Sequence, residues 1–242
     1  MKKTILALAI AAAFAPALAM AEAGDIVVRL RATHISADES SDLGKKTDSA
    51  YGTPGLSTTL YGAQGTGAEL EVDSNTIPEL DFSYYITKNI AAELILAVGT
   101  RHDVKVSGSG SAVGLNHDLG SVNLLPPTLT VQWHFMPDET FDPYVGAGLS
   151  YVRAMDNSLS ARTAVGNFPI KIDRNSWGPA IQAGFDVNLK DRWLVNFDVK
   201  KIWWDTDVKL NTFGAVLPGG WHKIDKLDVD PWVISVGVGK KF

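Results

Sequence analysis

Apolar and polar residues alternate with a period of two along most of the chain, and this alternation constrains the fold more than any other feature of the sequence. In residues 230–242 the even positions include Trp232 and Ile234, whereas the odd positions include Ser235 and Gly237. Such a pattern predicts a β-strand with one bulky apolar face and one small or polar face. The same alternation recurs in residues 24–36, 70–86, 89–105, 122–135, 141–152, 175–188 and 192–205, so eight strands are expected.

The connections between these segments alternate in length. Three are short turns, at Thr87–Asn89, Met136–Thr140 and Leu189–Asp191. The others are long and rich in Gly, Ser and Asn, at residues 37–69, 106–121, 153–173 and 206–228. Short turns on one rim and long loops on the other are typical of a transmembrane β-barrel. After residue 21 no run of 18 apolar residues occurs, which excludes a helical membrane span.

The polar face of the predicted strands carries charges of both signs at mid-strand. These residues are Arg29, Arg31, Glu79, Asp81, Glu93, Arg101, Asp186, Asp198 and Lys200. In a soluble β-sandwich they would face water, whereas in an eight-stranded barrel they would meet and pair in a narrow interior. Aromatic residues near strand ends fit the two interfacial girdles of a barrel, at Trp133, Phe135, Trp177, Trp193, Trp203 and Trp232. The sequence therefore predicts an all-β fold, an eight-stranded antiparallel transmembrane β-barrel with short periplasmic turns and long extracellular loops.

The first 21 residues have the features of a secretory signal peptide. Lys2 and Lys3 precede an apolar stretch, and a small-x-small pattern favours cleavage after Ala21. We expect residues 22–242 to form a single barrel domain in the outer membrane of a Gram-negative bacterium. The net charge of −5 argues against a nucleic-acid partner, and the absence of cysteine excludes disulfides and thiolate sites.

No catalytic, cofactor-binding or metal-binding motif emerges from the sequence. No two of the five histidines have metal-ligand spacing, and "GVGKKF" lacks the context of a phosphate-binding loop. One enzymatic alternative is a lipid A-modifying barrel, in which an outward-facing His102 would act with Ser107 or Ser109, although a glutamate at suitable spacing is missing. A structural or adhesion barrel that acts through its long loops is a further alternative.

Several prolines fall inside or at the start of predicted strands. Pro78, Pro126, Pro127 and Pro179 each remove a hydrogen-bond donor from the β-ladder, which weakens or bulges the strand locally.

Four blocks resemble the OmpW family of small outer-membrane proteins, which includes the AlkL and OprG branches. They are "LPPTLTVQWHF" (125–135), "PYVGAGLSY" (143–151), "DRWLVNFDV" (191–199) and "DPWVISVGVGKKF" (230–242), and the resemblance extends from about residue 24 to residue 242. The resemblance implies an eight-stranded barrel with both termini in the periplasm. It also implies an apolar channel in the outer half, closed toward the periplasm, with a lateral opening for small apolar molecules. An apolar solute that cannot pass a filled lumen would leave sideways into lipid at a weak point of the wall, so Pro78, Pro126 and Pro127 are candidates for this opening.

Ile95 matches an inward apolar position of the family's channel, and the alternation also places it inward. A position that is tryptophan in part of the family is Lys200 here, so the resemblance does not imply a uniformly apolar channel. Loop residues would complete an apolar path, with Leu56, Leu60, Phe168 and Phe213 as candidates.

We thus predict passive uptake of small hydrophobic molecules with no cofactor. The expected partners are outer-membrane lipids and lipopolysaccharide, hydrophobic solutes and, through the terminal Phe242, the outer-membrane assembly machinery.

Overall fold

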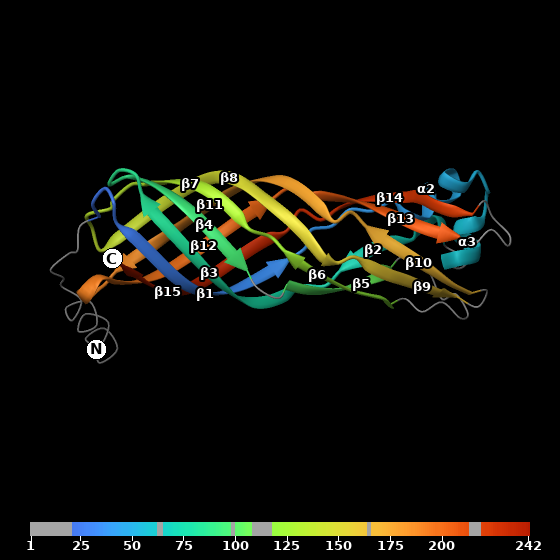
Figure 1. Cartoon of the computed structure of the whole chain (residues 1–242), viewed down its shortest axis with the longest axis horizontal. Helices are drawn as coiled ribbons and strands as arrows, with labels where there is room; N and C mark the ends of the chain where they lie inside the picture. The colour runs from blue at the N-terminus through green and yellow to red at the C-terminus, as the bar shows by residue number, and fades with distance from the viewer. Residues whose placement is uncertain (1–20, 62–64, 98–99, 108–117, 164–165, 213–218) are drawn as a thin grey trace, which may run out of the picture.

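Eight antiparallel strands form a closed barrel that continues, at one end, into a smaller folded extension (Figure 1). A computed structural model describes residues 21–61, 65–97, 100–107, 118–163, 166–212 and 219–242. The predicted signal peptide, residues 1–21, lies outside this range except for Ala21. The barrel strands are β1 (Ile26–Ser36), β3 (Asn75–Tyr85), β4 (Ile90–Ala97), β7 (Thr128–His134), β8 (Phe141–Asp156), β11 (Asn175–Asn188), β12 (Trp193–Ile202) and β15 (Trp232–Lys241).

The barrel closes because its first and last strands pair. Val27 of β1 lies opposite Lys241 of β15, and the antiparallel register continues to Ser36 and Trp232. β8 and β11 complete the ring with a long ladder along both strands. The chain end and the short turns share one rim, and the helices lie at the opposite end of the molecule (Figure 1). The predicted eight-stranded antiparallel barrel is confirmed.

The two faces of the barrel wall differ in the way that the alternation predicts. Outward positions carry exposed apolar side chains, including Leu30, Leu80, Phe82, Leu94, Leu129, Val131, Trp133, Val145, Leu149, Ile181, Phe197, Ile234, Val236 and Val238. On β8 this band runs from Phe141 to Leu149 and ends at Tyr151. Ten residues at about 3.3 Å each, tilted by about 40°, rise roughly 25 Å, which matches the apolar band of an outer-membrane barrel.

The long connections are folded rather than loop-like, which differs from the sequence expectation. Together with parts of the predicted strands 70–86, 89–105 and 122–135, they form the strands β2 (Glu69–Val72), β5 (Thr100–Ser107), β6 (Asp118–Leu125), β9 (Ser158–Thr163), β10 (Gly166–Ile172), β13 (Asp205–Thr212) and β14 (Gly220–Asp228). They also contain the helices α2 (Leu43–Tyr51) and α3 (Leu56–Tyr61) and the 3₁₀ turn Gly65–Gly67. A second 3₁₀ turn, Lys190–Arg192, connects β11 and β12 at the other rim. Neither α-helix among the described residues is long and apolar enough to cross a membrane.

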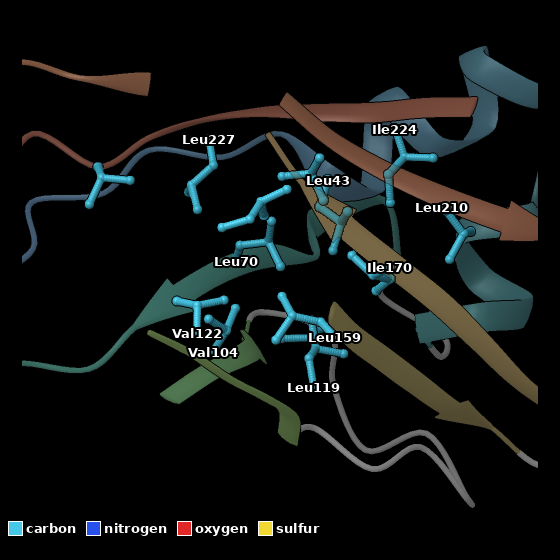
Figure 2. Close-up of a cluster of buried hydrophobic side chains, with 14 of the residues drawn as sticks. Leu43, Leu70, Val104, Leu119, Val122, Leu159, Ile170, Leu210, Ile224 and Leu227 are labelled. Atoms are coloured by element: carbon cyan, nitrogen blue, oxygen red, sulfur yellow. The ribbon is translucent and has the colours of Figure 1, made fainter. Parts of the chain in front are cut away.

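The extension has its own apolar core, shown in Figure 2. α2 contributes Leu43, and the strands contribute Leu70, Val104, Leu119, Val122, Leu159, Ile170, Leu210, Ile224 and Leu227. β9, β10, β13 and β14 form one sheet, and β2, β5 and β6 extend the barrel sheet on the other side. Burying these side chains away from water is what holds the extension together, because each contributes roughly 1.5–3 kcal/mol.

Three predicted strands are each divided in two, and the first of them, 70–86, forms β2 and β3. The segment 89–105 forms β4 and β5, and the segment 122–135 forms β6 and β7 with Pro126 and Pro127 between them. Inward side chains occupy odd positions in β4 and even positions in β5, so the alternation changes phase between Ala97 and Thr100. A single alternating pattern extended across this break therefore assigns the wrong face to every residue of β5.

Candidate functional site

A buried charge cluster fills the barrel lumen. Arg29 and Arg31 are two residues apart on β1 and so point into the lumen together. The register places Arg29 opposite Asp81 and Arg31 opposite Glu79 on β3. Arg29 Nη1 lies 3.1 Å from Asp81 Oδ1, and Arg31 Nη2 lies 2.6 Å from Glu79 Oε1. Cross-strand pairing thus converts a sequence spacing into matched ion pairs.

Other strands bring further members to this cluster. Arg29 Nη2 lies 2.6 Å from Asp186 Oδ2 of β11, and Lys200 Nζ lies 3.1 Å from Asp198 Oδ1 of β12. Glu93 of β4 lies 3.4 Å from Arg31 Nη1. All of these side chains are at most 4% exposed. We call the set Arg29, Arg31, Glu79, Asp81, Glu93, Asp186, Asp198 and Lys200 the charged plug.

Neutral hydrogen-bonding groups complete the plug. Gln182 Nε2 donates to Glu93 Oε2 at 2.8 Å, and Tyr144 Oη donates to Asp198 Oδ2 at 2.9 Å. Asn196 Nδ2 donates to Asp186 Oδ1 at 2.8 Å. Buried ions are stable only when paired and hydrogen-bonded, and here both conditions are met by side chains from across the lumen.

An apolar cavity lies on the outer side of the plug. Glu79 and Lys200 line it together with Ile95, so the cavity reaches the plug. Its apolar lining includes Ile35, Ala97, Leu124, Val152, Ile202, Trp204, Val229 and Val233. The other polar contributors are Thr100, Thr128 and His102. A lining that is mainly apolar with a few polar groups suits a small apolar molecule.

A second apolar cavity adjoins the first. Val72, Leu124, Trp204 and Val229 line both cavities. Beyond them the second cavity is lined by core residues of the extension, among them Leu70, Val104, Val122, Leu159, Ile172, Val208 and Leu227. Apolar lining therefore continues from the core of the extension to the charged plug.

The wall beside the first cavity lacks ladder pairs between the end of β4 and the segment that joins β6 to β7. The β4–β7 ladder ends at Ile95 and Thr128, and in the described residues the β5–β6 ladder begins at Thr100 and Leu124. Leu96 and Ala97 keep their pairs with β3. On their other side, opposite Pro127 and Pro126, the described residues show a break in the ladder. We call it the ladder gap.

The three candidate prolines flank the ladder gap. Pro78 lies opposite Ala32 of β1 and directly precedes Glu79, at which the described part of the β3–β4 ladder begins. Pro126 and Pro127 lie between β6 and β7, and Pro126 lines the first cavity. Proline has no N–H to donate, so the chain cannot restore a full ladder at these positions.

Two predicted orientations are wrong. Arg101 was expected in the lumen and His102 on the outer surface, but Arg101 is exposed and His102 is buried and lines the cavity. The phase change between Ala97 and Thr100 is the cause. His102 Nδ1 lies 2.9 Å from the carbonyl oxygen of Asp73, and this inward position does not fit a lipid-facing catalytic set with Ser107. Ser109 lies outside the described residues.

The loop residues that were expected to complete the channel lie elsewhere. Leu56 and Leu60 are buried in the core of the extension, and Phe168 is half-buried against it. None of these three lines either cavity, and Phe213 lies outside the described residues. The lining comes instead from Trp204, Val229 and other residues that the sequence analysis assigned to strand ends and loops. Short alternating stretches in 205–212 and 220–228, such as Val208 and Leu210, are the sequence feature that could have indicated strands in these connections.

One group in the lumen has metal-ligand chemistry. His134, Asp142 and Asp186 each offer a ligand atom, and these atoms lie within 4.8 Å of one another. The sequence suggested no such site because the ligands come from three strands. His134 Nδ1 lies 2.7 Å from Asp142 Oδ2, and Asp186 is paired with Arg29. The protein's own groups thus satisfy the cluster, and we assign it to the polar filling of the lumen.

Comparison with known proteins agrees with this architecture. The model of the OmpW family matches residues 22–242. Outer membrane protein W of Vibrio cholerae is 35% identical over 245 residues, covering all of both chains. The crystal structure of OprG from Pseudomonas aeruginosa aligns with a TM-score of 0.71 at 30% identity, covering 91% of this chain and 97% of that one.

A more distant relative is a dibenzothiophene metabolism operon protein, PahQ, of Pseudomonas aeruginosa. It is 26% identical over 186 residues, covering 76% of this chain and 79% of its own length. The family match over nearly the whole predicted mature chain confirms both the resemblance and the predicted location in the Gram-negative outer membrane. The chain is a member of the OmpW family of outer-membrane proteins.

Proposed function

We propose that this barrel is a passive channel that takes up small hydrophobic molecules and releases them sideways into the outer membrane. The observation that carries the proposal is an apolar cavity that ends on a charged plug and meets the wall at the ladder gap. In this proposal the plug residues and Ile95 line the lumen, whereas Pro78, Pro126 and Pro127 border the exit. No energy source or cofactor is required.

The plug opposes forward movement of an apolar solute. Its ions are buried and paired, and separating them would cost several kcal/mol per uncompensated charge. An apolar molecule offers no hydrogen bonds in exchange. A solute in the cavity therefore has two low-cost directions, back through the extension or outward through the wall.

The ladder gap lowers the cost of the outward direction. Opening a continuous β-ladder breaks backbone hydrogen bonds that lipid cannot replace, which costs several kcal/mol for each group. At Pro126 and Pro127 there are no N–H groups to lose. Outside this gap lies the apolar outer face, with Leu94 and Leu129 exposed toward lipid.

The names of relatives support an apolar cargo. PahQ is named for dibenzothiophene metabolism, and dibenzothiophene is a flat apolar aromatic molecule. A cavity lined mainly by aliphatic residues and Trp204 suits molecules of that class.

A reversible cross-link tests the exit directly, because the chain has no cysteine of its own. Leu96 and Pro127 are the next residues past the Ile95–Thr128 pair, so the variant L96C/P127C places a disulfide across the ladder gap. We expect oxidation to abolish uptake of an apolar fluorescent probe in cells, and reduction to restore it.

The matched control is L94C/L129C, which joins two residues that already pair in the intact ladder. Its oxidation should leave uptake unchanged. Undiminished uptake by oxidised L96C/P127C would contradict exit at the ladder gap, and equal loss in both variants would contradict its specificity.

A further inference from the structure

Three exposed arginines lie close together on one side of the molecule, just beyond the apolar band. Arg101 is on β5, Arg153 is on β8, and Arg174 directly precedes β11. These strands are connected in one sheet: Arg101 pairs with Asn123 of β6, β6 pairs with β8, and Arg153 pairs with Asn175 of β11. We call Arg101, Arg153 and Arg174 the outer arginine patch.

The patch lies at the level where the membrane ends. Tyr151 and Trp177 face each other on β8 and β11 with ring centroids 4.6 Å apart, and Trp177 is exposed. Such aromatic residues mark the interface between hydrocarbon and headgroups. Arg153 is two residues beyond Tyr151 on the same face of β8. Its guanidinium group therefore reaches the layer in which lipid headgroups lie.

In the part of the chain that the structure describes, the guanidinium groups of these arginines are free of ion pairs, and Arg101 and Arg174 are contacted through their carbonyl oxygens. Within the described residues, none of the three forms an ion pair, although the exposed acids Asp103 and Asp156 are close in sequence. Lys201, on the other side of the barrel, differs: its Nζ lies 3.0 Å from Asp38 Oδ2 and stands over the ring of Trp232.

Across the barrel from β8, the described outward positions of β1 beyond the apolar band carry no arginine or lysine. His34 of β1 lies at this level and is hydrogen-bonded to Thr76 of β3 at 2.9 Å. β3 adjoins the patch at its end, where Asn75 Nδ2 donates to the carbonyl oxygen of Arg101 at 2.7 Å. The arginines thus lie along β5, β8 and the start of β11, and Arg153 lies next to Pro126 and the ladder gap because it pairs with Leu125.

We propose that the outer arginine patch binds the phosphate groups of the phosphorylated glycolipid of the outer leaflet, the lipid A part of lipopolysaccharide. Arginine presents a planar fork of donors that matches a phosphate, and charge-assisted hydrogen bonds of this kind are strong. Several guanidinium groups spread over neighbouring strands fit a headgroup that carries two separated phosphates. The bound glycolipid lies beside the ladder gap, against the wall where Leu125 and Pro126 leave the sheet.

The test uses the folded full-length barrel in detergent, titrated with diphosphorylated lipid A and with fully dephosphorylated lipid A. Bound lipid is counted by native mass spectrometry. The variant is R101Q/R153Q/R174Q, and the matched control is K88Q/K190Q/R192Q, which removes three positive charges from the opposite rim. Heat-modifiable migration confirms that each variant is folded.

We expect diphosphorylated lipid A to bind at least about tenfold more tightly than the dephosphorylated form, since one charged hydrogen bond accounts for roughly a factor of ten. The patch variant should lose this preference, and the control should keep it. Equal binding of both lipids, or an unchanged preference in the patch variant, would overturn the proposal. Inorganic phosphate that displaces lipid A at equal concentration would also overturn it, because the site would then not recognise a lipid.

Discussion

The barrel lumen and the extension beyond it are built from the same alternating strands but have opposite interiors. In the membrane, most inward residues are charged, polar or small and the outward residues are apolar, although Val27 and Leu194 belong to a small apolar cluster inside the barrel. In the extension, most inward residues are apolar and most charged residues face water, with the buried Asp225 as an exception. β8 crosses from one region to the other without changing phase: its inward positions change from Asp142 and Ser150 to Val152 and Ala154.

This inversion explains where the cavity lies. The surroundings determine the polarity of the outward side chains, because lipid favours apolar side chains around the barrel and water favours polar ones around the extension. The interior takes the opposite character in each region. An apolar interior therefore meets a charged one inside the same tube, and the first cavity lies at this junction, with Ile95 and Val152 on one side and Lys200 on the other.

The largest expected effect is a loss of stability when the ion pairs on the charged side of the junction are disrupted. The substitution Arg29→Ala leaves Asp186 buried without its cation and removes one of the two cations that pair with Asp81, the other being Arg31. We expect the free energy of unfolding to fall by about 3–5 kcal/mol. Urea titration followed by heat-modifiable migration measures the loss.

Lys88→Ala serves as the control for Arg29→Ala, because it removes an exposed ion pair with Asp138 on the periplasmic rim. That change should cost less than about 1 kcal/mol. Similar losses in the two variants would show that the plug contributes no more than a surface pair.

The second-largest expected effect is a loss of uptake when a larger side chain fills the cavity on the apolar side of the junction. Ile95 is 3% exposed and lines the first cavity, so Ile95→Trp occupies space that a solute would need. We expect uptake of an apolar probe to fall to the level of cells without the protein, with a stability cost of about 1–3 kcal/mol.

Ile181→Trp is the matched control for Ile95→Trp, because Ile181 is exposed on the outer face of the barrel. Uptake should be unchanged in this variant. Full uptake through Ile95→Trp would contradict a route through the first cavity.

The smallest effect concerns the helices of the extension. The backbone N–H groups of Ser57 and Gly55 donate to the Asp48 carboxylate at 2.6 and 3.1 Å, which connects α2 to α3. Burial raises the pKa of Asp48, but these hydrogen bonds outweigh it and hold the pKa below its ordinary value. The resulting stability is fully present above the unfolded pKa of about 4 and is lost as pH falls through the lower folded pKa.

Asp48→Asn should therefore destabilise residues 43–61 locally by about 0.5–1 kcal/mol at pH 7, after allowance for solvent exposure. Hydrogen exchange of this segment measures the change. The difference between the variant and the unmodified chain should shrink as the pH falls toward 3. A difference that stays constant with pH would contradict the assignment.

Much of the barrel was predictable from sequence because alternation and turn length are local properties. The pairing of the plug charges was also predictable, since Arg29 and Arg31 share the inward face of β1. The register of β1 with β3 then places Asp81 and Glu79 opposite them. The phase change between β4 and β5 was not visible, because residues on both sides alternate regularly and only their tertiary partners reveal the break. Arg101 and His102 were assigned to the wrong faces for that reason.

The extension was harder to predict than the barrel. Its core residues are single apolar positions, such as Leu43 and Leu70, separated by polar residues and glycines. Each segment resembles a loop when considered alone. Only the pairing of β2 with β5 and of β13 with β14 brings these residues together and creates the lining of the second cavity.

The most direct test of the central claim measures two quantities on the same reconstituted barrel: transfer of an apolar fluorescent probe into the bilayer and ion conductance across it. A charged plug below an apolar cavity with a lateral exit predicts rapid probe transfer while conductance stays at the level of the protein-free bilayer. Conductance that rises above this level without accelerated probe transfer would contradict the account and indicate a narrow aqueous pore.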